Sequence, residues 1–159
     1  MNPNNFKGYF KNFAKPTRFE VEGFGMPEGL RFAVKAASIP GTNVGTIEVP
    51  YQGRKLKYAG DRTYQPWTIT VINGIDYDIH NEFLKWQALL NDPVSNLGVD
   101  PIAYKRDGKV IQLDEGENSI KEFEFYGAFP QEVSPIELSW ENNDAVEEFT
   151  VTLEYDLHV

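Results

Sequence analysis

The chain has 159 residues and a mass of 18.1 kDa, which is the size of one domain. Its 41% hydrophobic and 14% aromatic content can form a core, which excludes a disordered chain. No apolar run approaches the roughly 18–20 residues that span a bilayer. The absence of cysteine excludes disulfides, thiol nucleophiles and cysteine metal sites.

The net charge of −9 is distributed unevenly along the chain. Residues 1–79 carry ten Lys and Arg against seven Asp and Glu, whereas residues 80–159 carry five against seventeen. Acidic surfaces repel phosphate, so the composition disfavours sequence-independent binding to nucleic acid. Two halves of unlike charge favour head-to-tail association of copies. The alternative explanation of these charge counts is that the second half simply has more solvent-exposed strand faces.

Residues 1–15 combine four aromatic side chains with no regular period: Phe6, Tyr9, Phe10 and Phe13. The segment is either a frayed terminus or an arm that docks its aromatic residues. We predict a docking arm, because so much aromatic surface is unfavourable in water.

Two alternating segments follow the arm. Residues 17–24 place Phe19 and Val21 between charged residues, and residues 30–36 alternate in the same way. The turn residues 26–29 lie between the segments, so the pattern predicts a β-hairpin.

Residues 42–58 are polar and hold few side chains that could enter a core. Their pattern predicts two short strands joined by a projecting loop, which carries Arg54, Lys55 and Lys57. Such loops often make contacts with other molecules; an ordinary mobile loop is the alternative.

Residues 76–90 form the single helix that the sequence predicts. Asp76 is suited to the N-cap, Phe83 and Trp86 recur at helical spacing, and Asn91-Asp92-Pro93 stops the run. The other predicted elements are strands over 67–71, 102–105, 109–113 and 122–125, an acidic turn over 114–118, and a long alternating strand over 149–159. The fold is therefore predicted as one mainly β domain over 1–159, with two packed antiparallel sheets in a sandwich or barrel and one α-helix at an edge.

Catalytic constellations are missing from the sequence. His80 and His158 are far apart and are predicted to be surface or capping residues, and the serines lack the nucleophile-elbow spacing. Two distant histidines make a poor zinc site, and the acidic turn lacks the calcium-loop spacing. We predict no enzymatic activity, no metal and no cofactor.

Acidic strand faces without a catalytic pocket suit a conduit for DNA, because a basic wall would hold phosphates and slow their transit. The candidate lumen-facing residues are Glu20, Glu22, Glu122, Glu124, Glu154 and Asp156.

The run Ala59-Gly-Asp-Arg-Thr63, followed by Trp67-Thr-Ile-Thr-Val71, resembles the tail tube protein of contractile-tailed, T-even-type bacteriophages. The basic residues 53–57, the helix with its aromatic pair, Leu138-Ser-Trp140 and the closing strand over 148–153 match in the same order. The resemblance covers most of residues 16–157.

This resemblance implies a virion protein, assembled in the host cytoplasm, whose hexameric rings stack into a tube that delivers DNA. Its implied partners are other copies of itself, the tail sheath, the baseplate, the tape measure and tail terminator proteins, and DNA in transient passage. The implied inter-subunit residues are Val49, Tyr51, Arg54, Lys55, Lys57, Tyr58, Asp61 and Arg62. Asp61 and Arg62 form either a fixed ion pair at the loop base or a solvent-exposed pair.

Two alternatives stay open at this stage. The same fold serves type VI secretion and other contractile injection tubes, which pass proteins. A monomeric β-sandwich that binds carbohydrate would instead use exposed aromatic residues such as Tyr51, Tyr58 and Tyr64.

Overall fold

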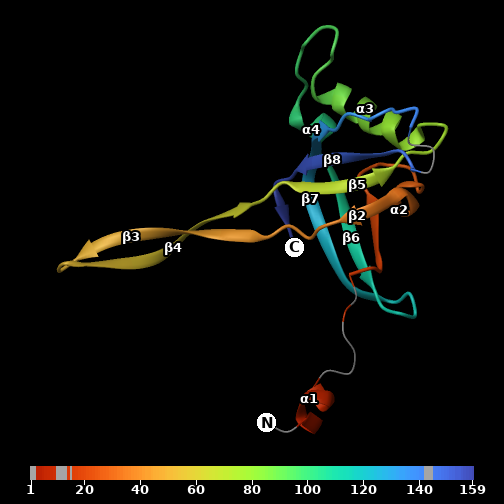
Figure 1. Cartoon of the computed structure of the whole chain (residues 1–159). Coiled ribbons are helices and arrows are strands. Elements are labelled where there is room, and N and C mark those ends of the chain that lie inside the picture. The colour runs from red at the N-terminus through yellow and green to blue at the C-terminus, as the bar shows by residue number, and fades with distance from the viewer. Residues whose placement is uncertain (1–2, 10–13, 15, 142–144) are drawn as a thin grey trace.

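The computed structural model describes residues 3–9, 14, 16–141 and 145–159, most of them in strands (Figure 1). The elements in chain order are α1 (Pro3–Tyr9), β1 (Phe19–Gly23), α2 (Leu30–Ala33), β2 (Val34–Ala37), β3 (Thr42–Tyr51), β4 (Arg54–Tyr64), β5 (Trp67–Ile72), α3 (Asp78–Leu90), α4 (Pro101–Tyr104), β6 (Arg106–Leu113), β7 (Ser119–Val133), β8 (Glu148–Glu154) and β9 (Leu157–His158). None of the described helices has the length and apolar character that a membrane crossing requires.

The body is a seven-stranded antiparallel sheet in the order β1-β6-β7-β8-β5-β2, with β9 beside β7. The first half of β7 pairs with β6 and its second half pairs with β8, so one strand belongs to two sheet halves. Gly127 lies between the halves with φ 66°, where a Cβ would meet the Asp156 carboxylate at 2.2 Å. The halves face each other across the core, as Phe125 stacked on Trp67 at 4.5 Å shows. The predicted mainly β fold with two packed antiparallel sheets is confirmed.

An aromatic cluster fills the space between the sheet halves. Phe24 packs against Trp67, Trp86 and Phe125, with ring centroids 5.7–6.4 Å apart. Trp86 comes from α3, which covers the open end of the core, and its indole N–H donates to the Tyr104 carbonyl at 2.6 Å. Burying each such ring stabilises the fold by about 1.5–3 kcal/mol.

The helix α3 begins at Asp78, two residues later than the sequence predicts. Its N-cap is Tyr77 in a left-handed conformation, and no side chain caps the helix. Asp76 forms a hydrogen bond with the Asp78 carboxyl group, and this bond raises the pKa of Asp78. The described residues also contain α1, α2 and α4, which are shorter helices that the sequence pattern does not predict.

Four predictions about the strands are wrong. The predicted strand over 149–159 is interrupted, because β8 ends at Glu154 and the two residues of β9 pair with β7. Residues 30–33 form α2, and β1 and β2 do not form a hairpin: they lie at opposite edges of the sheet, beside β6 and β5. Alternation identifies the buried face of a strand but not its partner, and here both partners are distant in sequence. Residues 101–104 form α4 instead of a strand, because Asp100 caps this turn by accepting the Ile102 N–H at 3.3 Å.

The predicted N-terminal arm includes α1. Docking by Phe6, Tyr9, Phe10 and Phe13 cannot be assigned, because these side chains lie outside the part of the chain that is described.

Candidate functional site

The hairpin of β3 and β4 projects from the body as a long two-stranded ribbon (Figure 1). Its register runs from Thr42 opposite Tyr64 to Tyr51 opposite Arg54. The turn residues between the strands, 52 and 53, both have positive φ, as a type I′ turn requires. Among the described strands, β3 and β4 pair only with each other, so the hairpin extends beyond the predicted 42–58 and has no core of its own.

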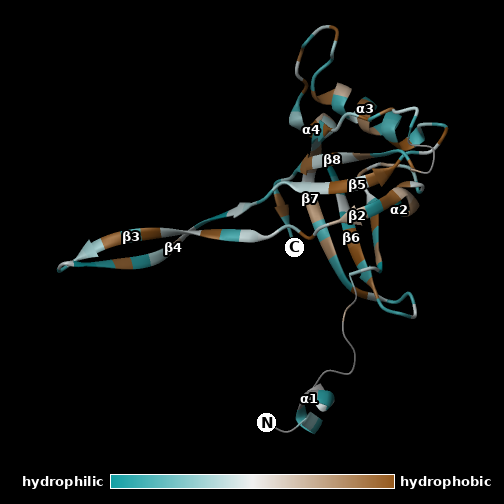
Figure 2. Cartoon of the chain, viewed as in Figure 1, coloured by the Kyte–Doolittle hydropathy of each residue, from teal (hydrophilic) through white to brown (hydrophobic). Residues whose placement is uncertain are grey.

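One face of this hairpin is apolar. The register places five apolar side chains on that face, each 41–59% exposed: Ile47, Val49, Tyr51, Leu56 and Tyr58. Figure 2 shows the resulting hydrophobic bands far from the core. A two-stranded hairpin is marginal in water by itself, and an exposed apolar face of this kind marks a contact surface. We call these five residues the apolar hairpin face.

The opposite face of the hairpin is charged. Lys55 and Lys57 lie there with Glu48, and the Lys55 ammonium is 3.4 Å from the Glu48 carboxylate. This exposed pair contributes about 0–1 kcal/mol. The second lysine stays available for a partner of opposite charge.

The eight predicted inter-subunit residues therefore divide between the two faces. Four of them, Val49, Tyr51, Arg54 and Tyr58, share the apolar side, whereas both lysines lie on the charged side. Asp61 and Arg62 are exposed near the base of the hairpin. As consecutive residues of β4 they point to opposite faces, and the ion pairs of the described residues do not include this one.

The sequence prediction omitted Ile47 and Leu56 from the contact residues. Reading the period of two across the Gln52-Gly53 turn would have added them, because Ile47 lies opposite Tyr58 and Leu56 lies opposite Val49.

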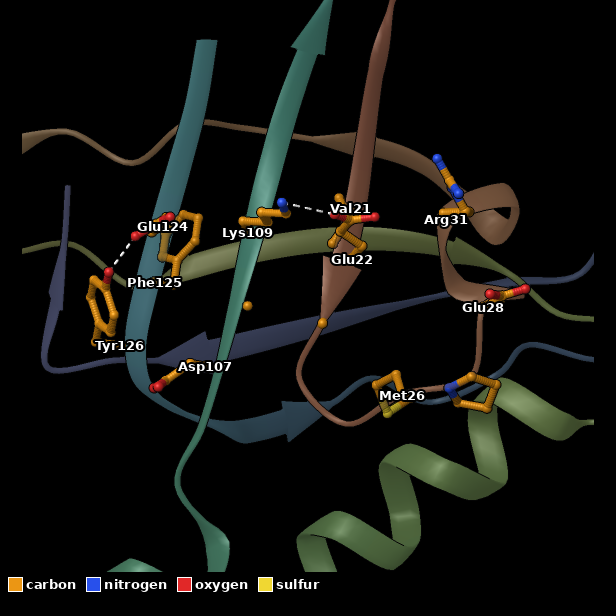
Figure 3. Close-up of a pocket in the computed structure, with 13 residues that line it drawn as sticks. Val21, Glu22, Met26, Glu28, Arg31, Asp107, Lys109, Glu124, Phe125 and Tyr126 are labelled. Atoms are coloured by element: carbon orange, nitrogen blue, oxygen red, sulfur yellow. Dashed lines mark hydrogen bonds and ion pairs between the residues drawn. The ribbon is translucent and has the colours of Figure 1, made fainter. Parts of the chain in front are cut away.

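Four of the six predicted acidic residues lie together on the outer face of β1, β6 and β7: Glu20, Glu22, Glu122 and Glu124. Figure 3 shows two of them, Glu22 and Glu124, on either side of Lys109. Lys109 of β6 lies between them, with its ammonium 3.1 Å from Glu22 and 3.7 Å from Glu122. The hydrogen bond to Glu22 raises the pKa of Lys109, so the lysine stays charged and partly neutralises the face. We call these four carboxylates the acidic sheet face.

Glu154 and Asp156 lie elsewhere. Glu154 is on the outer face of β8, where the neighbouring side chains are threonines such as Thr68 and Thr152, whose hydroxyl oxygens are 3.3 Å apart. Asp156 follows β8, and its carboxylate accepts hydrogen bonds from the Lys105 ammonium at 2.8 and 2.9 Å. These two carboxylates therefore do not extend the acidic sheet face.

An open groove of about 550 Å³ borders the acidic sheet face, between Met26, Arg31 and Tyr126 (Figure 3). Arg31 donates to Glu20 and is thereby held at the rim. The residues that the structure describes contain no group of three or more His, Asp or Glu side chains that could hold a metal ion.

The two histidines, which the sequence predicts to be surface or capping residues, are half-buried. His80 packs edge-on against Phe149 at 4.9 Å, and His158 packs against Tyr64 at 5.2 Å. Both imidazoles therefore belong to aromatic packing.

The three tyrosines of the carbohydrate hypothesis do not form one platform. Tyr51 and Tyr58 are exposed on the hairpin, but Tyr64 packs against Tyr155 at 5.8 Å. A sugar-stacking surface built from all three is therefore absent.

Comparison with known proteins identifies the family. The family model "Phage tail tube protein" matches residues 1–159. The chain is 33% identical over 147 residues to "Tail tube protein gp19" of Enterobacteria phage T4, covering 91% of this chain and 90% of that protein. It is also 34% identical over 117 residues to the "Tail tube protein" of Serratia phage KSP90, covering 73% of this chain and 66% of that protein.

Solved structures show the same fold at low sequence identity. The anti-feeding prophage cap matches with a TM-score of 0.72 and 17% identity, covering 94% of this chain and 91% of that one. The sheath-tube complex of an extracellular contractile injection system, PVC, matches with a TM-score of 0.67 and 16% identity, covering 100% and 97%. The predicted resemblance is confirmed: the chain belongs to the phage tail tube protein family, whose members are structural components of the virion.

Proposed function

We propose that this tail tube protein assembles into hexameric rings, that the rings stack into the inner tube of a contractile tail, and that the hairpin of β3 and β4 bridges neighbouring rings. The apolar hairpin face is the observation that carries the proposal. Its five side chains are 41–59% exposed in a single chain and need a surface to cover them.

Ring closure is supported by the edges of the sheet. β1 and β2 are the outer strands, and among the described strands neither has a partner on its outer side. Open edges invite pairing with another chain. A head-to-tail contact between copies gives a closed ring when its rotation returns to the first copy, and an open filament when it does not. A stacked tube uses a contact of the first kind within each ring and a contact of the second kind between rings.

The acidic sheet face is proposed to line the lumen. Four carboxylates against one lysine and one arginine leave the face negative. Such a wall repels phosphate and lets double-stranded DNA pass without binding. The protein acts as a conduit without enzymatic activity, and its further partners are the sheath, baseplate, tape measure and tail terminator proteins of the same tail.

A tube that passes protein in a contractile injection system is the second candidate. Matches to a prophage cap and an injection-system tube favour it, but their identity is only 17% and 16%. The 33% identity to a phage tail tube protein over most of the chain favours the phage tube.

Electron microscopy of the purified protein tests the proposal. We expect rings or tubes of uniform width from the wild-type chain. Replacing residues 44–62 by a short Gly-Ser turn keeps the base of the hairpin and should abolish stacking while circular dichroism still reports a folded body. A monodisperse monomer at high concentration, or tubes that form without the hairpin, would refute the proposal.

A further inference from the structure

The loops that follow β5 and precede β8 lie at the end of the body opposite to the hairpin (Figure 1). β5 leaves the hairpin at Trp67 and ends at Ile72, which lies opposite Glu148 of β8. The loops at this distant end carry four apolar side chains that are each at least 66% exposed: Ile75, Leu138, Trp140 and Val146. Exposed residues of this size are unusual in a loop unless something covers them.

A groove of about 560 Å³ opens at the same end. One wall comes from residues 134–139 and the other from residues 145–150, with Leu138 and Val146 facing it from the two sides. We call this the end groove.

The rim of the end groove is acidic. Residues 134–141 and 145–148 contain four glutamates and no lysine or arginine. Glu148 is bound by the Lys35 ammonium at 2.9 Å, and Glu147 accepts the Tyr77 hydroxyl at 3.0 Å. Glu137 and Glu141 are exposed and form no ion pair with any described residue.

We propose that the end groove receives the β3–β4 hairpin of a second copy of this chain; the assignment rests on the stacked tube proposed above. The hairpin carries four Lys and Arg against two Asp and Glu over residues 42–64, so its charge is opposite to that of the groove rim. Its two faces fit the groove in a defined way. The apolar hairpin face covers Leu138, Trp140 and Val146, while Lys55 and Lys57 meet Glu137 and Glu141.

The placement of the two surfaces also identifies the occupant. Hairpin and groove lie at opposite ends of one molecule, so a copy that inserts its hairpin still offers its own groove to the next copy (Figure 1). Such a contact is heterologous and propagates along an axis, as stacking requires. In this contact the apolar hairpin face is covered and the lysines select the register.

Cysteine cross-linking tests the pairing directly, because the chain has no cysteine of its own. A chain with Leu56→Cys and Leu138→Cys, treated with a flexible bismaleimide, should give a ladder of dimers, trimers and longer species on a denaturing gel. The matched control combines Leu56→Cys with Ile120→Cys, whose native residue is 49% exposed at the start of β7. A ladder no stronger than that of the control would overturn the assignment.

Charge exchange tests the register. Lys55→Glu with Lys57→Glu should shorten tubes at least tenfold, as should Glu137→Lys with Glu141→Lys, and the chain carrying all four substitutions should restore their length. The control combines the lysine reversals with Glu115→Lys and Glu117→Lys. This control chain has the same net charge as the chain with all four substitutions, but its two new lysines lie in the turn after β6. Restoration by both combinations, or by neither, would overturn the end groove as acceptor. If the wild-type chain forms tubes and removal of the hairpin abolishes them, the proposed function stands even when the end groove is not the acceptor. If the wild-type chain forms neither rings nor tubes, the proposed function itself is refuted.

Discussion

At the residue scale, the centre of the fold depends on the close packing of an aromatic ring on a glycine. Phe24 has a left-handed backbone conformation, with φ 57°, and its ring lies directly over Gly108. A Cβ added at Gly108 would be 2.3 Å from the ring, far inside van der Waals contact. The ring cannot retreat, because Trp67 and Trp86 pack on it from other sides.

We therefore expect Gly108→Ala to lower the free energy of unfolding by about 1–3 kcal/mol through overpacking. The measurement is urea unfolding followed by near-ultraviolet circular dichroism. Gly98→Ala is the matched control, since nothing lies within 4 Å of its added methyl group, and it should change stability by less than about 0.5 kcal/mol. Equal unfolding midpoints for the two variants would contradict the close contact.

Tyr155 makes stability depend on alkaline pH. Burial raises the pKa of its hydroxyl group to about 12, and the neutral hydroxyl donates to the Gln65 carbonyl at 2.7 Å. The folded chain thus holds this proton more tightly than the unfolded chain, whose tyrosine has a pKa of about 10. The resulting stability is fully present below pH 10 and is lost as the pH rises through about 12.

Comparing wild type with Tyr155→Phe isolates this effect from other alkaline titrations. Below pH 9 we expect a constant deficit in the variant of about 0.5–1.5 kcal/mol, from the lost hydrogen bond. Above pH 10 the deficit should shrink, because only the wild type loses the stability linked to this group. Urea midpoints at intervals from pH 8 to 12 measure it; a deficit that stays constant or grows would contradict the raised pKa.

At the element scale, the hairpin of β3 and β4 differs from the central strands of the body. Its side chains are exposed on both faces, while β5 and β8 bury alternate residues in the core. Segments with few buried contacts open locally at low free-energy cost.

Hydrogen exchange should therefore divide the chain into two classes. In the dispersed subunit, amides of residues 44–62 should exchange at least tenfold faster than those of β5 and β8. In assembled tubes the hairpin amides should become protected, while those of the buried strands change little. Hairpin amides that remain equally fast in tubes would show that assembly does not cover them.

The same elements show what a sequence pattern can and cannot predict. The alternation around Val151 predicts β8 well, because one buried face repeats at every second residue. β7 could not be predicted at its full length, since Gly127 and Pro130 are normally strand breakers. Here Gly127, with φ 66°, continues the strand instead of ending it, and beside it the Tyr126 carbonyl accepts the Asp156 N–H at 2.9 Å. For the acidic sheet face, alternation could predict that the glutamates lie on the polar face of their strands. It could not predict that Lys109 lies between them, because β6 is distant in sequence from β1.

At the scale of the whole molecule, the proposed lumen depends on net repulsion of phosphate. The acidic sheet face loses part of its charge to Lys109 and Arg31, so two further reversals would make it basic. We expect tubes with Glu122→Lys and Glu124→Lys to retain double-stranded DNA that wild-type tubes release.

Co-sedimentation of DNA with tubes measures this retention, which should weaken steeply as salt rises. Wild-type tubes and tubes with Glu115→Lys and Glu117→Lys are the controls and should retain little. If the turn variant retains as much DNA as the sheet-face variant, the acidic sheet face does not line the conduit.

The exposure of Trp140 has an optical consequence. Of the three tryptophans, Trp67 and Trp86 are fully buried, whereas Trp140 is 99% exposed. The indole emission of the dispersed subunit therefore contains one red-shifted component that iodide quenches and two that it does not reach. Any partner that covers this end of the body removes the quenchable component, so the unlabelled protein reports its own assembly in real time.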